Sequence, residues 1–264
     1  MGRKIVIHCG FHKTATTTVQ KFFDVNRPAL SDHADIFLHR EISAIKTKAV
    51  QYSLTKDPRF LLGLIAEFET LLSSAISNST QDVLISSEDL MGQIPGWDHI
   101  LNYDAANEIL PALLEVMRDS QLFDQHIFYF STRNQADWIE SAYWHLVAMD
   151  RMTLSFDGYC EKFALENQLN EVYENLKAHL QGAEIYSADV GVLRGAEFGP
   201  STPLLDLLEI PQSKRDKLVL SKNLRERTKM SSYLAMLEIN RQPNLTEDER
   251  FRLKRPFQTE IRVR

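Results

Sequence analysis

The chain has 264 residues, of which 44% are hydrophobic and 25% are charged, a composition typical of a soluble globular protein. Its net charge of −6 excludes a broadly basic surface for nucleic acid and leaves only local basic sites. The length predicts a single domain over residues 1–264, although two domains would also fit it.

Cysteine usage and hydropathy bear on where the protein works. Cys9 and Cys160 are too few for a disulfide framework, and reduced thiols favour a cytoplasmic location. The first apolar run begins by Lys4, which leaves no room for a signal peptide, and no apolar run is long enough to cross a bilayer. We therefore expect no membrane span and no nucleic-acid partner, whereas the oligomeric state is not readable from the sequence.

Short apolar runs alternate with helical patterns along the chain. The predicted strands are Ile5–Cys9, Val83–Ser86, Ile127–Ser131 and Glu184–Tyr186. The predicted helices cover residues 14–23, 58–76, 104–118, 135–149 and 156–179, followed by a short helix at 203–209 and a longer one near 226–241. This alternation predicts an α/β fold with a central parallel sheet flanked by helices on both faces.

Two segments fit this alternation less well. Residues 24–57 mix short apolar stretches with basic residues and are a candidate lid or acceptor-binding insertion; the basic residues are His33, His39, Arg40, Lys46 and Lys48. Residues 242–264 form a basic C-terminal segment, for which a solvated tail is the default interpretation and anion binding the alternative.

The most informative stretch is residues 10–18, which read GFHKTATTT between a predicted strand and a predicted helix. The first turn of a helix offers unpaired backbone N–H groups and the positive end of the helix dipole. Lys13 adds a full positive charge, and the threonines add hydroxyl donors. The sequence therefore predicts a loop that binds a phosphate or a sulfate.

The order of residues in this loop differs from that of kinases and ATPases. Their pattern, G-x-x-x-x-G-K-[ST], places a lysine directly after the second glycine. Here Gly10 fits the first glycine, but Ala15 occupies the second glycine position and Thr16 the lysine position. Because the lysine stands at position 13 instead, the loop argues against a magnesium-dependent phosphoryl transferase.

A second candidate anion site follows the strand at Ile127–Ser131. Arg133 stands at the carboxyl end of this strand, the edge at which open α/β sheets bind ligands. Its guanidinium suits a phosphate bidentately, and Ser141, eight residues on, adds a hydroxyl about two helical turns away. The alternative is that Arg133 belongs to a structural ion pair.

Both segments resemble those of sulfotransferases that use 3′-phosphoadenosine 5′-phosphosulfate (PAPS). The family patterns are close to K-[ST]-G-T-[ST] and R-[DN]-P-x-[DE]-x-x-x-S-x-Y. The matching positions are Lys13, Thr14, Thr16 and Thr17 in the first segment and Arg133, Asn134, Asp137, Ser141 and Tyr143 in the second. The chain departs from the patterns at Ala15 and Gln135. Since alanine disfavours a positive φ, we expect Ala15 to be already helical.

The resemblance implies a P-loop NTPase-like sulfotransferase fold and a PAPS co-substrate, with no metal ion. Gly10 and Lys13–Thr17 would bind the 5′-phosphosulfate, and Arg133 with Ser141 the 3′-phosphate. Lys13 would neutralise the oxygen that bridges sulfur and the 5′-phosphate. The partner would be the hydroxyl of a small-molecule, lipid or carbohydrate acceptor.

A general base must take the proton of that hydroxyl. Glu88 follows the strand at Val83–Ser86 and is the first candidate, because carbohydrate sulfotransferases place a glutamate near the equivalent strand end. Asp89 is the fallback, and His12 could contact the sulfate or the acceptor. His8, inside a strand, is expected to be a hydrogen-bonded core residue.

Two other functions stay open at this stage. A P-loop kinase using ATP and magnesium would employ Glu88 or Asp89 as a metal-associated carboxylate. The substitutions at Ala15 and Gln135 also leave room for a nucleotide-binding module without catalysis. No spacing of histidine, cysteine and carboxylate residues is typical of a metal site.

Overall fold

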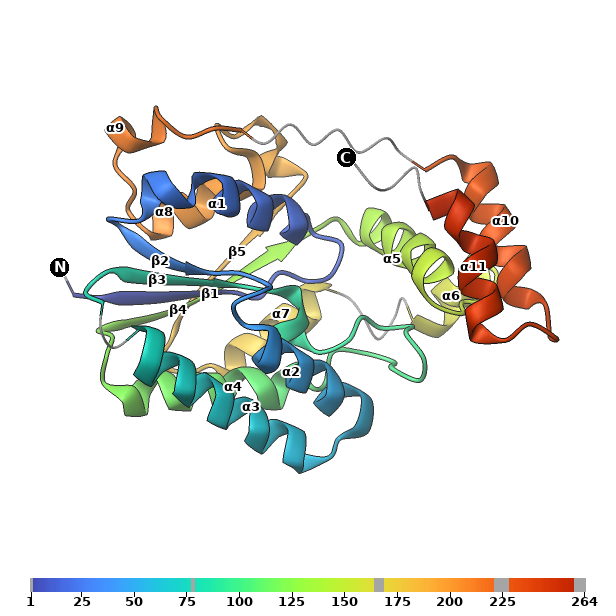
Figure 1. Ribbon diagram of the computed structural model, residues 1–264, viewed down its shortest axis with the longest axis horizontal. Coiled ribbons are helices and arrows are strands. Elements are labelled where there is room, and N and C mark those ends of the chain that lie inside the picture. Colours follow the sequence, from blue (N-terminus) through green and yellow to red (C-terminus); the bar gives the residue numbers. More distant parts are fainter. Residues whose placement is uncertain (1, 77–78, 164–168, 221–227, 259–264) are drawn as a thin grey trace. The chain divides into compact units, whose positions relative to one another are not determined.

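A computed structural model of the chain describes residues 2–76, 79–163, 169–220 and 228–258 (Figure 1). The described residues form two compact units where the sequence favoured one domain. The first unit combines residues of the ranges 1–93, 103–134 and 168–221, and the second combines residues of the ranges 94–102, 135–167 and 222–264.

The first unit is an α/β structure built on a parallel sheet, as predicted. Its strands are β1 (Lys4–His8), β2 (Ala34–Phe37), β3 (Asp82–Ser86), β4 (Gln125–Thr132) and β5 (Glu184–Asp189). They lie in the order β2-β3-β1-β4-β5, and every neighbouring pair is parallel. β1 is therefore central, between β3 and β4.

Four of these strands coincide with the predicted apolar runs, while β2 was not predicted. The central strand β1 is buried along its whole length, which explains its nearly continuous apolar sequence. β2 has only four residues and includes Asp35, so it lacks the apolar run that marks the others. Residues 24–57, predicted as a lid or an insertion, thus contribute a strand of the sheet.

Helices cover both faces of this sheet (Figure 1). α1 (Thr16–Leu30) and α8 (Thr202–Leu207) lie on one face, where Val19, Phe23 and Leu204 share one buried hydrophobic cluster with Val6 of β1. The other face carries α2 (Ser43–Thr55), α3 (Pro58–Leu71), α4 (Ala106–Ser120) and α7 (Leu169–His179). Short elements complete the unit: η1 (Leu72–Ile76), η2 (Glu88–Met91), η3 (Val192–Gly195), η4 (Gly199–Ser201) and α9 (Gln212–Arg215).

The chain leaves β1 and β3 toward opposite faces of the sheet. From β1 it continues into α1, and from β3 it continues through η2 to α4 on the other face (Figure 1). Such a switch between adjacent parallel strands opens a crevice at their carboxyl ends, which is where α/β sheets bind ligands. The predicted anion loop leaves β1 at this switch point.

The second unit is helical and contains α5 (Gln135–Met149), α6 (Phe156–Phe163), α10 (Met230–Arg241) and α11 (Glu247–Gln258). The helix predicted at 156–179 is α6 and α7, and its residues 164–168 lie outside the described ranges. None of the helices in the described ranges combines the length and the apolar character needed to span a bilayer.

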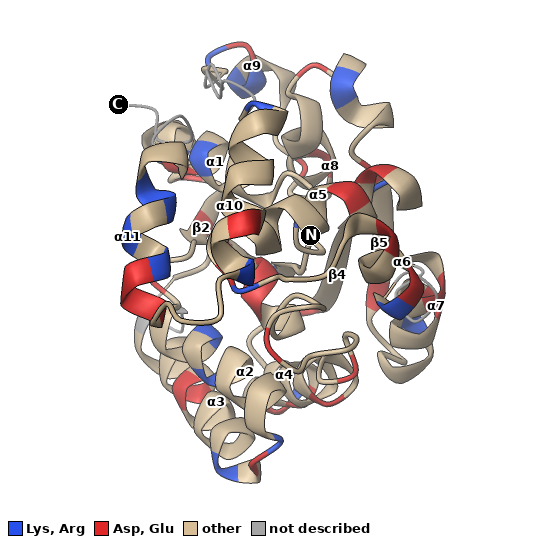
Figure 2. Ribbon diagram, turned by 90° about the vertical axis from the view of Figure 1, so that its right-hand side faces the viewer, with Lys and Arg blue, Asp and Glu red and all other residues tan. Residues whose placement is uncertain are grey.

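The basic C-terminal segment is not a solvated tail over its described part. It includes α11, whose first turn is acidic and whose later turns are basic (Figure 2). Lys254 is buried, and its Nζ donates hydrogen bonds to the carbonyl oxygens of Val147 (3.2 Å) and Asp150 (2.7 Å) at the end of α5. Burial lowers the pKa of Lys254 to about 8. Arg262 and Arg264 lie outside the described residues.

Candidate functional site

The turn after β1 passes very close to β4. A Cβ atom added at Gly10 would lie 2.2 Å from Ser131 Oγ and 2.9 Å from His8 Nε2, so no larger residue fits there without displacement. Cys9 N donates to Tyr129 O (3.0 Å), and Phe11 N donates to Ser131 O (3.3 Å). The loop is thus fastened to the carboxyl end of β4.

Two residues of the loop adopt the left-handed backbone region. Lys13 has a φ of 68° and Ala15 a φ of 66°. The expectation that Ala15 is helical is therefore wrong, since α1 begins only at Thr16. For a residue with a Cβ this conformation costs about 1–2 kcal/mol relative to glycine. The structure thus requires at position 15 the conformation that glycine adopts without strain.

The threonines of the loop differ in what their hydroxyl groups do. Thr14 is buried, and its Oγ1 contacts the Phe11 carbonyl oxygen and Ser131 Oγ, while its N–H also bonds to Phe11. Thr14 therefore holds the shape of the loop. Thr16 is also buried, but its Oγ1 has no hydrogen-bond partner among the described residues. Thr17, next along α1, is half-buried.

An unpartnered buried hydroxyl is costly unless a ligand or water satisfies it. Thr16 begins α1, and the first hydrogen bonds of the helix are donated by Thr18 N and Val19 N to the Ala15 carbonyl oxygen, so the N–H groups of Thr16 and Thr17 come before them. Hydroxyl and backbone donors thus coincide at the positive end of the helix dipole. This arrangement can bind an anion.

Arg133 lies beside the loop, as the parallel pairing of β1 and β4 requires. Its Nη1 donates to the carbonyl oxygen of Lys13 at 3.4 Å, which brings these two predicted site residues together. Ser141 lies on α5, in the second unit, and is half-buried there. The structure thus joins Arg133 to the loop, whereas Ser141 belongs to the other unit.

Glu88 stands at the start of η2, directly after β3. Gln20 of α1 donates from Nε2 to Glu88 Oε2 (3.1 Å) and to the Ser86 carbonyl oxygen (3.2 Å). Gln20 was not among the predicted site residues. Its spacing of four residues from Thr16 could have placed it on the same face of α1.

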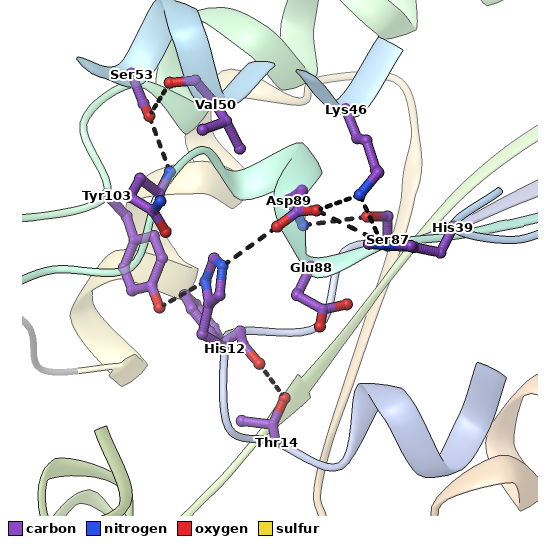
Figure 3. Close-up of polar contacts among 12 residues, drawn as sticks. His12, Thr14, His39, Lys46, Val50, Ser53, Ser87, Glu88, Asp89 and Tyr103 are labelled. Atoms are coloured by element: carbon purple, nitrogen blue, oxygen red, sulfur yellow. Dashed lines mark hydrogen bonds and ion pairs between the residues drawn. The ribbon is translucent and has the colours of Figure 1, made fainter. Parts of the chain in front are cut away.

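Asp89 lies at the centre of a polar cluster (Figure 3). Its Oδ1 is 3.7 Å from His12 Nε2, and its Oδ2 is 3.3 Å from Lys46 Nζ and 3.9 Å from His39 Nδ1. Lys46 Nζ is also 2.7 Å from His39 Nε2, and Tyr103 OH is 3.3 Å from His12 Nδ1. The basic character of residues 24–57 was the only sequence signal for Lys46 and His39.

The charges of this cluster favour the ionised form of Asp89. Burial would raise the pKa of this carboxyl, but the neighbouring His12 and Lys46 lower it below its ordinary value. His12 is almost fully buried, and both of its ring nitrogens face protein groups. The geometry gives His12 a role in holding the loop against η2.

His8 is a hydrogen-bonded core residue, as predicted. It is fully buried, with Nδ1 2.8 Å from Ser86 Oγ and Nε2 3.2 Å from Ser131 Oγ. Desolvation lowers its pKa to about 3. His8 therefore stays neutral and links β1 to both neighbouring strands.

Within the described ranges, no three histidine, cysteine or carboxylate side chains are placed to hold a metal ion. No protein-family model matches this sequence, and comparison with curated proteins finds no match either.

Proposed function

We propose that this chain is a sulfotransferase that moves the sulfuryl group of PAPS to an acceptor hydroxyl. The observation that carries the proposal is the buried hydroxyl of Thr16 at the N-terminus of α1, which has no hydrogen-bond partner within the described ranges and lies in the same loop region as Lys13 and Arg133. These donors surround the carboxyl end of β1 at the switch point of the sheet.

The loop would bind the 5′-phosphosulfate of PAPS. Thr16 and Thr17 would donate their hydroxyl groups and backbone N–H groups, while Thr14 and Gly10 keep the loop in shape. Among the described residues, Arg133 makes one side-chain hydrogen bond, to the Lys13 carbonyl oxygen, so its other donors could bind the 3′-phosphate.

In the reaction, the acceptor oxygen would form a bond to sulfur while the bond from sulfur to the 5′-phosphate oxygen breaks. 3′-Phosphoadenosine 5′-phosphate leaves with the electron pair of that bond, and Lys13 would neutralise the charge on the leaving oxygen. Glu88, oriented by Gln20, would take the proton of the acceptor hydroxyl. Acceptors of the carbohydrate, lipid and small-metabolite classes fit this chemistry equally.

Calorimetric titration with 3′-phosphoadenosine 5′-phosphate and with ADP, each with and without magnesium, tests the proposal. We expect the 3′-phosphate compound to bind more tightly, by at least about tenfold, with or without magnesium, because it alone carries the 3′-phosphate. Preference for ADP with magnesium would support a kinase instead. Binding of neither nucleotide would reject the proposal.

The variant Lys13→Ala separates catalysis from binding. We expect release of 3′-phosphoadenosine 5′-phosphate from PAPS, measured with a panel of hydroxyl acceptors, to fall by about 10²-fold or more, while nucleotide affinity falls less. Lys21→Ala, which removes an exposed lysine from the same helix region, is the matched control. A module without catalysis would show no turnover in the unaltered chain.

A further inference from the structure

The Asp89 carboxylate joins three segments that are far apart in the sequence (Figure 3). His12 comes from the anion loop, His39 from the turn after β2, and Lys46 from α2. All three side chains approach one carboxylate, and His12 and Lys46 favour its ionised form. The carboxylate can accept hydrogen bonds at both oxygens, so it can bridge them.

The contact between Lys46 and His39 determines where the proton of His39 lies. An ammonium group can only donate, so Nε2 of His39 accepts from Lys46 Nζ. The proton of the neutral ring then sits on Nδ1, the nitrogen that faces Asp89 Oδ2. Both side chains thus present donors to the same carboxylate oxygen.

The contacts from His12 through Asp89 to Lys46 form a bridge between the loop and α2, and both η2 and α2 are also held by contacts outside this bridge. Ser87 Oγ accepts a hydrogen bond from Asp89 N (3.2 Å) and so caps η2. α2 is joined to the same segment at a second place, where Ser53 Oγ accepts from Gln93 N (2.9 Å). Loss of Lys46 would therefore leave α2 in contact with the chain after η2.

The loop at the other end of the bridge is strained. Lys13, which directly follows His12, and Ala15 both have positive φ values, 68° and 66°. Such strained conformations persist when the surrounding contacts stabilise them by more than the strain costs. His12 supplies those contacts from within the loop, since it faces Asp89 on one side and Tyr103 on the other.

We propose that Asp89 and Lys46 are positioning residues that hold the anion loop in its binding conformation through His12. This inference deepens the proposed function, and its ligand test rests on that function. The bridge itself involves only contacts within the protein, so a second test without ligand decides it separately.

The variant Asp89→Asn tests the role through the sign of its effect. If Asp89 acted only as a nearby negative charge, its neutralisation would strengthen binding of the anionic nucleotide. If Asp89 positions the loop, we expect affinity for 3′-phosphoadenosine 5′-phosphate to fall by about tenfold, measured by calorimetry. Unchanged or increased affinity would overturn the proposal.

Two lysine variants of α2 provide the matched comparison. Lys46→Met should lower the nucleotide affinity as Asp89→Asn does, and the double variant should lose little more than either single one. Lys48→Met removes the same charge two residues away, where the side chain lies over Gly63 of α3, and should leave the affinity within about twofold of the unaltered chain. Equal losses in the two lysine variants would show a general charge effect and contradict the proposal.

Hydrogen exchange of the ligand-free protein tests the bridge even if no nucleotide binds. We expect the amides of Phe11 and Thr14 to exchange about tenfold faster in Asp89→Asn and Lys46→Met, because the hydrogen bonds of these two amides lie in the loop that the bridge holds. Amides of β1 should keep their protection, which shows that the variants are folded. Unaltered exchange at Phe11 and Thr14 would show that the bridge does not hold the loop.

Discussion

Ala15 occupies a backbone conformation that suits glycine better. Its φ of 66° lies in the left-handed region, one residue before α1 begins. The methyl group adds about 1–2 kcal/mol of strain, which the contacts of the loop to β4 must offset. At the scale of one residue, the shape of the anion loop thus lowers the stability of the fold.

The variant Ala15→Gly should therefore stabilise the protein. Relief of strain exceeds the added chain entropy of the unfolded state by about 0.5–1 kcal/mol, which urea unfolding can measure. Ala66→Gly, at an exposed position inside α3, is the control and should destabilise by about 1 kcal/mol. If both variants lose stability equally, the left-handed conformation at Ala15 is wrong.

At the scale of elements, the path from β1 into α1 depends on a close approach to β4. Gly10 leaves no room for a side chain, because Ser131 Oγ, His8 Nε2 and Thr16 Oγ1 lie within 3.0 Å of where its Cβ would be. Thr14 then fastens the turn to Ser131. Close contacts therefore join the strand, the turn and the start of the helix.

Gly10→Ala should disrupt this element, whereas Gly195→Ala should not. We expect the first to cost about 1–3 kcal/mol through overpacking and to weaken binding of 3′-phosphoadenosine 5′-phosphate. Gly195 is exposed, and apart from its chain neighbours no described residue comes within 4 Å of where its Cβ would be, so its variant should stay within about 0.5 kcal/mol of the unaltered chain. Equal stability of the two variants would contradict the close packing at Gly10.

At the scale of the whole molecule, the stability of the first unit depends on a neutral histidine in its sheet. His8 lies on the central strand and bonds to Ser86 of β3 and Ser131 of β4. Its folded pKa of about 3 is below the ordinary value near 6.5. Between these two pH values the unfolded chain binds a proton that the folded chain does not, so stability is complete above about pH 6.5 and falls as the pH is lowered toward 3.

Urea unfolding at several pH values between 7 and 4 measures this dependence. Titration of His8 in the unfolded chain should lower the free energy of unfolding by up to ~1.4 kcal/mol for each pH unit below about pH 6. His8→Asn, whose amide can replace Nδ1 in the contact with Ser86, should show a shallower slope whatever its stability at pH 7. Replacement of the exposed His179 by glutamine should leave the slope unchanged, and an equal slope in His8→Asn would refute the assignment.

The architecture was predictable where a local pattern carries the information. Buried strands of a parallel sheet need continuous apolar runs, so β1, β3 and β4 were found, and the threonine-rich turn marked the start of α1. β5, the largely exposed strand at one edge of the sheet, was marked only by the short run Glu184–Tyr186. β2 was missed because an edge strand of four residues with a charged member lacks such a run. The helix α11 was missed because charge dominates its sequence, although Lys254 is buried.

The sequence alone predicted the α/β alternation, which the structure confirms, and a turn with candidate anion-binding residues between β1 and α1, because both depend on neighbours a few residues apart. It could not show the strand order, the left-handed backbone at Ala15, or the hydrogen bond from Gln20 to Glu88. The bridge from His12 through Asp89 to Lys46 was equally hidden. Each of these depends on segments that meet only when parallel strands pair and bring their carboxyl ends to one edge of the sheet.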